Sequence, residues 1–95
     1  MPKYISLLQF TDKGAREIKS STTRAAAFDK AAEKAGVRIE AQYWTIGDYD
    51  GLLIISANKE EQALNCLTSL MASGNVRSNT MQAFDAKQFD RLTGK

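Results

Sequence analysis

Two short stretches of the chain are hydrophobic on both sides of an extended backbone. Lys3–Phe10 (KYISLLQF) and Leu52–Ala57 (LLIISA) are rich in residues that favour strands and contain few polar interruptions. Strands that are apolar on both faces usually lie at the centre of a sheet, where they are covered on both sides. We therefore expect these two segments to be central strands.

Two further stretches carry more polar residues, which is typical of edge strands. Val37–Ile46 (VRIEAQYWTI) alternates between apolar and polar residues, and Val76–Phe84 is a last, more polar strand. On the first of these strands, the alternation predicts one shared face for Arg38, Glu40, Gln42 and Trp44. On the last strand, the corresponding face carries Arg77, Asn79 and Met81.

Apolar residues at helical spacing fill the stretch between the first two strands. Ala15–Ala35 follows this pattern, and its hydroxyl cluster Ser20–Thr23 predicts a kink or a second helix start. The reason is that hydroxyl side chains compete for backbone hydrogen bonds. Thr11 or Asp12 is placed to cap the start of the segment, and Gly36 is placed to end it.

A second helix is predicted over Asn58–Ser73, where an apolar stripe again recurs at helical spacing. Asn58 is the expected N-cap, and Glu61 three residues later would complete a capping box. Residues 47–51 (GDYDG) have the composition of a turn between the second and third strands of the chain. A short terminal helix is predicted over Ala86–Leu92.

The predicted order is β-α-β-β-α-β, with the most apolar strands first and third. Order and polarity together indicate an α+β fold of the ferredoxin-like kind, an antiparallel four-stranded sheet with two helices on one face. Because the central strands are apolar on both faces, part of the sheet must point hydrophobic side chains away from the helices. Such a patch is normally buried by a partner, so we expect a homodimer that packs sheet on sheet. The alternative is a monomer whose C-terminal segment covers the second face.

The amino-acid composition limits the classes of protein to which this chain can belong. The 95 residues make a single domain spanning 1–95, with ordinary hydrophobic and charged fractions. A net charge of +2, with acidic and basic residues interleaved, argues against a nucleic-acid partner. No apolar run approaches the roughly 18 residues of a membrane span. The one cysteine excludes an intrachain disulfide, so the expected location is cytoplasmic.

The chain lacks the residues and motifs of most catalytic centres. It contains no histidine, no CxxC pair, and neither a dinucleotide-binding motif nor a P-loop. We therefore expect no metal and no cofactor, and we assign no catalytic residue. Cys66 is interpreted as a small buried filler rather than a thiolate nucleophile, because no basic partner accompanies it.

The stretch Tyr43–Asp50 (YWTIGDYD) resembles the GYD domain family of small bacterial and archaeal proteins, whose motif maps onto Gly47, Tyr49 and Asp50. The resemblance leads us to expect an apolar residue at the start of the third strand, and Gly51 departs from this pattern. The resemblance implies a ferredoxin-like fold that pairs into a dimeric α+β barrel. It implies no activity, because the family is functionally uncharacterised. It covers nearly the whole chain, extending to Phe10–Gly14, Ile18-Lys19, Gly74–Arg77 and Ala83-Phe84.

Tyr49 and Asp50 stand out within the turn. Small and polar residues are enough to form a turn, so the large phenol of Tyr49 requires another explanation. In one interpretation Tyr49 packs over an edge, while Asp50 accepts hydrogen bonds from turn amides. In the other, the phenol is a proton donor and the carboxylate a base at the mouth of a cavity. We favour the structural interpretation.

A pocket with an aromatic wall is a further hypothesis. It would combine the polar faces of the two edge strands with the first strand, using Trp44, Gln42, Arg77, Asn79 and Tyr4. Alternatively, these residues form a dimer interface, because interfaces are enriched in Trp, Tyr, Met and Arg.

Two functions are compatible with these features. The first is a homodimeric small-molecule-binding, structural or sensing protein without catalysis. The second is a cofactor-independent enzyme, such as a monooxygenase or an isomerase, that works in the cavity of a dimeric barrel. The second rests on fold analogy alone, and we prefer the first.

Overall fold

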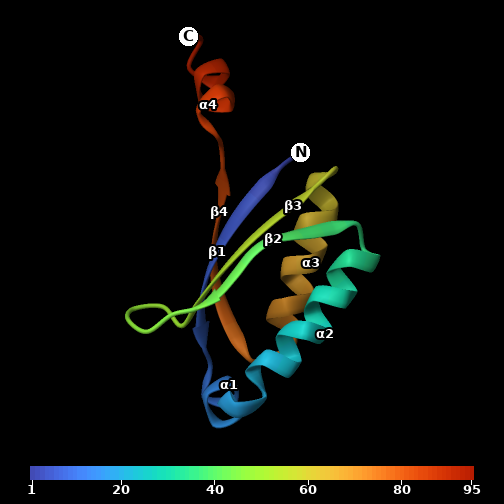
Figure 1. Ribbon diagram of the computed structural model, residues 1–95, viewed down its shortest axis with the longest axis vertical. Helices are drawn as coiled ribbons and strands as arrows, with labels where there is room; N and C mark the ends of the chain where they lie inside the picture. The colour runs from blue at the N-terminus through green and yellow to red at the C-terminus, as the bar shows by residue number, and fades with distance from the viewer.

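A computed structural model describes all residues from 1 to 95 and contains one four-stranded antiparallel sheet in the order β2-β3-β1-β4. The two most apolar strands are central and the two more polar strands are the edges, as the sequence pattern predicted (Figure 1). β3 begins at Gly51, although that residue departs from the pattern expected there. The strands are β1 (Lys3–Phe10), β2 (Val37–Trp44), β3 (Gly51–Ala57) and β4 (Val76–Ala83).

The first helical segment is divided. A short helix α1 (Asp12–Arg16) and a 3₁₀ turn η1 (Ile18–Ser20) precede the long helix α2 (Ser21–Lys34). The predicted second start within the hydroxyl cluster is therefore confirmed. Gly36 follows α2 with φ of +82°, a left-handed conformation that only glycine adopts without strain, so the predicted stop is also confirmed.

Two helix starts test the predicted caps. The Oγ1 atom of Thr11 accepts a hydrogen bond from the Gly14 N–H at 3.2 Å, so Thr11 caps α1. The second predicted cap is wrong by one residue, because helix α3 (Glu60–Ala72) has Lys59 as its N-cap. The Lys59 N–H donates to Oε1 of Gln62 at 3.1 Å, so Gln62 occupies the position expected for Glu61.

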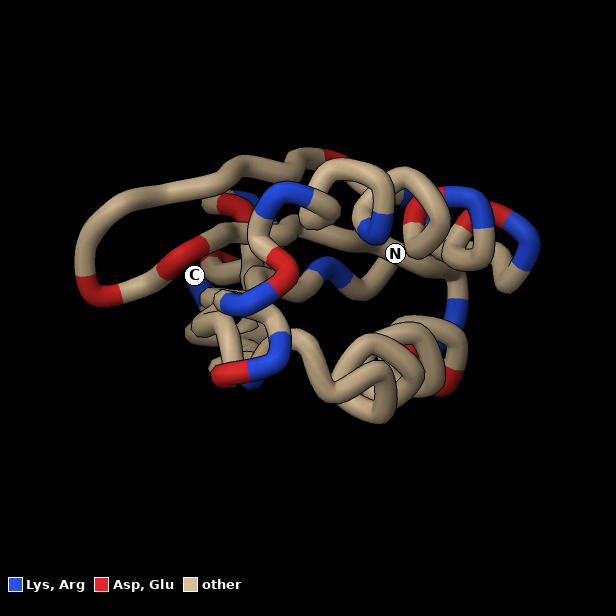
Figure 2. Tube along the Cα trace, turned by 90° about the horizontal axis from the view of Figure 1, so that it is seen from below, with Lys and Arg blue, Asp and Glu red and all other residues tan.

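The hydrophobic core lies between the sheet and the helices α2 and α3, which cover the same sheet face (Figure 1). Small residues on the two helices allow close packing against larger sheet residues. Charges of both signs are interleaved along the chain, and α3 carries none after Glu61 (Figure 2). The buried hydrophobic residues are Tyr4, Ala32, Val37, Leu53, Ile55, Ala57, Ala63, Cys66 and Leu67.

A β-bulge at Glu40 corrects the predicted faces of β2. Ile39 is opposite Ile55 and Ala41 is opposite Ile54, so Glu40 is an extra residue of β2 between two positions whose partners on β3 are adjacent. One extra residue reverses the alternation from that point on. The predicted shared face for Arg38, Glu40, Gln42 and Trp44 is therefore wrong, because Gln42 and Trp44 turn to the helices.

The C-terminal segment extends away from the rest of the chain as an arm (Figure 1). β4 leads through Phe84 and Asp85 into the helix α4 (Ala86–Leu92), as the sequence predicted. The Asp85 N–H donates to Gln88 Oε1, and the Gln88 N–H donates to Asp85 Oδ1, which fixes the helix start. The radius of gyration is 14.1 Å, against about 12 Å for a compact chain of this length. The segment therefore does not fold over the second sheet face.

Candidate functional site

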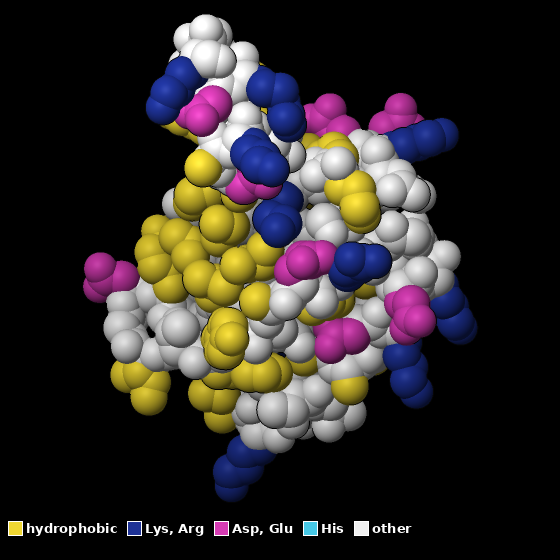
Figure 3. Space-filling model, turned by 45° about the horizontal axis from the view of Figure 1, so that its top comes forward, with side chains coloured by type: hydrophobic (Ala, Val, Ile, Leu, Met, Phe, Trp, Pro, Cys, Tyr) yellow, Lys and Arg dark blue, Asp and Glu magenta, His cyan; other side chains and the backbone are white.

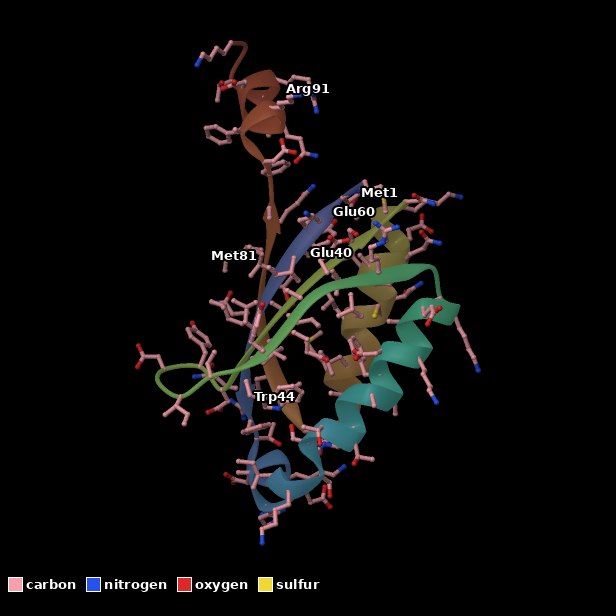
Figure 4. The ribbon with its side chains drawn as sticks, viewed as in Figure 1. Met1, Glu40, Trp44, Glu60, Met81 and Arg91 are labelled. Atoms are coloured by element: carbon pink, nitrogen blue, oxygen red, sulfur yellow. The ribbon has the colours of Figure 1, made fainter.

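The sheet face opposite α2 and α3 has a hydrophobic centre and no covering element. Cross-strand pairing aligns Ile5 with both Ile54 and Met81, and Leu7 with Leu52. Figure 3 shows hydrophobic side chains gathered below the C-terminal arm, and Figure 4 shows Met81 pointing away from the helices. We call this surface the open face. Its apolar centre consists of Ile5, Leu7, Leu52, Ile54 and Met81.

The loop between β2 and β3 projects at one end of the open face. Tyr49 contributes its hydroxyl, which accepts a hydrogen bond from Nδ2 of Asn79 at 3.4 Å. Gln9 on β1 donates from Nε2 to the backbone oxygen of Asp48 at 3.1 Å. Ile46 at the loop tip is fully exposed. The loop is thus attached to β1 and β4 while presenting an apolar side chain to solvent.

Asp50 connects this loop to the central strands. Its Oδ2 atom accepts a hydrogen bond from the Phe10 N–H at 2.8 Å, and its own N–H donates to the backbone oxygen of Leu8 at 2.8 Å. No hydrogen bond joins Asp50 to the Tyr49 hydroxyl, which lies by Asn79 instead. Asp50 thus accepts a backbone amide, but one at the end of β1 rather than one of its own turn, and no phenol–carboxylate pair is assembled.

Polar side chains border the other end of the open face. Glu40 in the bulge accepts a hydrogen bond from the Ser56 hydroxyl at 2.9 Å, and its carboxylate lies 3.8 Å from Nε of Arg38. Ser56 is buried, so this contact satisfies a hydroxyl that would otherwise be unpaired. The open face therefore has an apolar centre between two polar borders, the arrangement that protein interfaces share.

The structure separates the residues that were predicted to form one pocket. Arg77 and Asn79 lie on the open face, whereas Tyr4 lies in the core on the helix side. Gln42 donates from Nε2 to Oδ1 of Asp29 on α2 at 3.1 Å. Trp44 donates from Nε1 to the Ser21 hydroxyl at 2.9 Å, also on α2. The bulge accounts for the side taken by Gln42 and Trp44, whereas Tyr4 faces the helices through the regular alternation of β1.

Two buried groups have displaced pKa values. Tyr4 is 5% exposed, and its hydroxyl has no hydrogen-bond partner. Burial, with a smaller contribution from the nearby Glu60 carboxylate, raises the pKa of this phenol. Burial also raises the pKa of the Cys66 thiol, which disfavours the reactive thiolate form. Neither group is poised to react.

Three of the segments that carry the family resemblance, Phe10–Gly14, Tyr43–Asp50 and Gly74–Arg77, meet at one end of the sheet. Gly14 is buried against the turn after α3, where an added Cβ atom would lie 2.0 Å from the backbone oxygen of Asn75. The Thr11 N–H donates to that same oxygen at 3.1 Å. Asp50 and Arg77 border the polar hollow beside this contact. The contact requires glycine, which is a steric reason that sequence pattern alone did not reveal.

The helix side contains a cavity of about 450 Å³ that sequence reasoning missed. It lies between the sheet, α2 and α3, and its walls include Phe28 and Leu70. Apolar residues at helical spacing predict packing, and nothing in that pattern distinguishes a filled core from a hollow one. No group of three His, Cys, Asp or Glu side chains is placed to hold a metal ion. None of the helices has the length and hydrophobicity needed to cross a membrane.

Comparison with known proteins gives one family and one fold. The family model described as GYD domain matches residues 4–93. A relative from Thermus thermophilus, named "Glutamine synthetase and cystathionine beta-lyase binding protein", is 30% identical over 84 residues, covering 87% of this chain and 88% of the relative. The crystal structure of TTHA0845 from the same organism has a TM-score of 0.57 at 20% identity, covering 90% of this chain and 96% of that one.

Proposed function

The chain belongs to the GYD domain family, and from that premise we propose that it is a non-catalytic binding protein that acts as a homodimer. In this proposal the single domain 1–95 has the ferredoxin-like fold, and two copies pack their open faces together into a dimeric α+β barrel. The dimer then binds another protein, an enzyme of the kind that the Thermus relative is named for binding. The single cysteine suits a cytoplasmic protein.

The uncovered open face is the observation that carries the homodimer. Leu7, Leu52 and Ile54 belong to central strands whose other face is already covered by helices. Burial of an aliphatic side chain of this size contributes about 1.5–3 kcal/mol, so leaving several of them in water is unfavourable. The arm does not supply a cover, since α4 points away from the sheet (Figure 1).

A second copy suits the open face better than an unrelated surface. Two sheets that stack face to face lie about 10 Å apart, which brings their side chains into contact. A twofold axis through the apolar centre would place each polar border near the partner's border. Closed twofold dimers are also the commonest homo-oligomers.

The projecting elements are the surfaces that we assign to the enzyme partner. The loop tip carries the fully exposed Ile46, and α4 exposes Phe89 (57%) and Leu92 (63%). These side chains lie outside the apolar centre of the open face, so they stay available in the dimer. An apolar helix face with a fixed N-terminal cap is suited to insertion into a groove of another protein.

The enzyme alternative lacks a supporting observation. Its best candidates were Tyr49 and Asp50, whose side chains have separate partners in Asn79 and Phe10. Trp44 and Asp50 line the helix-side cavity, whereas Arg77 lies on the open face, so Tyr49, Asp50, Trp44 and Arg77 do not converge on one site.

Native mass spectrometry with matched variants tests the homodimer. Met81 on the open face and Leu64 on the outer side of α3 are each 44% exposed, so Met81→Asp and Leu64→Asp introduce the same charge at equally exposed positions. We expect dimers for the wild type and Leu64→Asp, and monomers for Met81→Asp. A monomeric wild type, or a dimeric Met81→Asp variant, contradicts the proposed interface.

Capture by a purified enzyme tests the proposed partner. Glutamine synthetase of the same source organism is immobilised and presented with the wild-type protein and the Ile46→Ser variant. We expect the wild type to be retained and the variant to be lost, with unchanged dimerisation. Equal failure of both proteins to bind excludes this enzyme as the partner while leaving the dimer intact.

A further inference from the structure

The cavity on the helix side lies on the opposite side of the sheet from the open face. Its volume of about 450 Å³ is within the range of small-molecule sites. It is bounded by the sheet on one side and by α2 and α3 on the other. The apolar walls are formed chiefly by Leu8, Phe10, Phe28, Leu53, Leu70 and Val76.

The apolar walls determine what can fill this space. A water molecule needs two to four polar partners to be well held in a cavity, and aliphatic and aromatic walls do not supply them. A hydrocarbon chain or ring makes dispersion contacts with such walls and removes them from water. The cavity therefore favours an apolar body over ordered solvent.

Arg24 provides a charged group at the cavity. One of its nitrogens, Nη1, donates to the backbone oxygen of Glu17 at 2.8 Å, which holds the side chain in place. No carboxylate of the chain forms an ion pair with it, because the one ion pair of the structure joins Arg38 and Glu40. The remaining guanidinium donors are available to another acceptor.

The other charged group at the cavity is already engaged. Asp50 lines the same space, but its Oδ2 accepts the Phe10 N–H. Gln42 and Trp44, which also line it, use their side-chain N–H groups on Asp29 and Ser21 of α2. Oδ1 of Asn75, which also lines the cavity, is a buried acceptor without a partner. The unpaired guanidinium is the free charged donor, and its planar fork matches a carboxylate.

We propose that this cavity binds a small apolar monocarboxylate, with its hydrocarbon or aromatic body among Phe28, Leu53 and Leu70 and its carboxylate on Arg24. The inference does not depend on the homodimer, because none of the apolar centre of the open face except Leu52 borders the cavity. A ligand of this class would contact α2, so the packing of α2 on the sheet would depend on whether the metabolite is bound.

Trp44 offers a direct readout. It is the only tryptophan of the chain and it lines the cavity beside the start of α2 (Figure 4). We would titrate the full chain with octanoate, octanol and octylammonium, which share a chain length and differ in their head groups, while recording tryptophan fluorescence. We expect saturable binding of octanoate, with octanol about tenfold weaker and octylammonium weaker still, because a charge-assisted hydrogen bond is lost or replaced by repulsion.

Two variants of equal charge change separate the carboxylate contact from general electrostatics. Arg24→Gln should weaken octanoate about tenfold, to the affinity of octanol, and leave octanol unchanged. Arg91→Gln, on α4 and remote from the cavity, should bind all three probes as the wild type does. A third variant, Ala25→Phe, fills the cavity and should abolish binding of every probe.

The negative outcomes are equally defined. Absence of a fluorescence change with all three probes, checked by calorimetry at millimolar ligand, overturns the proposal. Equal affinity for octanoate and octanol in both the wild type and Arg24→Gln also overturns it. If Ala25→Phe fails to fold, the comparison between Arg24→Gln and Arg91→Gln still shows whether the carboxylate binds at Arg24. The monomeric Met81→Asp variant should bind octanoate normally, which distinguishes failure here from failure of the dimer.

Discussion

The backbone N–H of Phe10 donates a hydrogen bond to Oδ2 of Asp50 at 2.8 Å, across the boundary between the end of β1 and the start of β3. This contact gives Asp50 a structural role that its position in an acidic turn did not specify. It holds the β2–β3 loop at a fixed position beside β1, and thereby determines where Tyr49 and Ile46 lie.

Removing the Asp50 carboxylate should destabilise the fold. Asp50→Ala leaves the Phe10 N–H without its acceptor, and we expect a loss of about 1–2 kcal/mol in the free energy of unfolding. Asp50→Asn retains an amide oxygen and should lose less. Tyr49→Phe is the control, because its hydroxyl makes only the long contact to Asn79. Chemical denaturation measures all three, and a wild-type midpoint for Asp50→Ala argues against this role.

Enlarging Gly14 should be costly. The Cβ atom of an alanine would lie 2.0 Å from the backbone oxygen of Asn75, and backbone atoms cannot rotate out of the way as a side chain can. We expect Gly14→Ala to lower stability by about 1–3 kcal/mol. Ala15→Ser, at the exposed neighbouring position, should change it by less than about 0.5 kcal/mol. Equal melting temperatures for both variants would show that the turn can move.

The raised pKa of Tyr4 predicts that the fold loses stability at alkaline pH. Its folded-state pKa is raised above the ordinary value of 10.0, so the folded chain retains this proton more tightly than the unfolded chain. The associated stability is complete below the ordinary phenol pKa and declines as the pH rises through the folded pKa. Tyr4→Phe should flatten this decline when unfolding is measured between neutral and strongly alkaline pH.

The same substitution has a second expected effect at neutral pH. Because the Tyr4 hydroxyl is buried without a partner, replacing it with hydrogen should leave stability unchanged or raise it by up to about 1 kcal/mol. A clear loss of stability in Tyr4→Phe at neutral pH would show that the hydroxyl has an acceptor, for which Glu60, whose carboxylate contributes to the raised pKa, is the candidate.

Deleting the arm should separate folding from partner binding. A chain that ends at Phe84 lacks α4, whose Phe89 and Leu92 are exposed rather than packed. We expect its melting temperature and its dimeric state to match those of the full chain. Retention by immobilised glutamine synthetase should be lost. A lower melting temperature that depends on protein concentration would instead place the arm on the second copy.

Much of the fold was predictable because it depends on local hydrophobic pattern. Continuous apolar runs identified β1 and β3, and the hydroxyl cluster before α2 marked a new helix start. The cap of α3 was misplaced by one residue, because the Gln62 side chain accepts from the Lys59 N–H and so makes half of the expected box one position later. Side-chain chemistry alone does not distinguish two adjacent registers of a helix start.

The candidate site was less predictable because it depends on long-range register. The expected pocket relied on strict alternation along β2, and a bulge leaves no mark in the polarity pattern. Gln42 and Trp44 consequently bind α2, whereas Arg77 and Asn79 lie on the open face. The amide that Asp50 accepts could not be identified from sequence either, since Phe10 is forty residues away.

The bulge at Glu40 divides β2 into two halves of opposite numerical parity. Before it, the odd-numbered Val37 and Ile39 face the helices; after it, the even-numbered Gln42 and Trp44 do. Deletion of Glu40 would remove the extra residue and leave Gln42 and Trp44 facing the helices, with one regular alternation along the whole strand. A regular pairing that kept Glu40 would instead carry the only tryptophan from the cavity to the open face. The one extra residue thus specifies the contents of both sides of the sheet as firmly as the identity of its neighbours does.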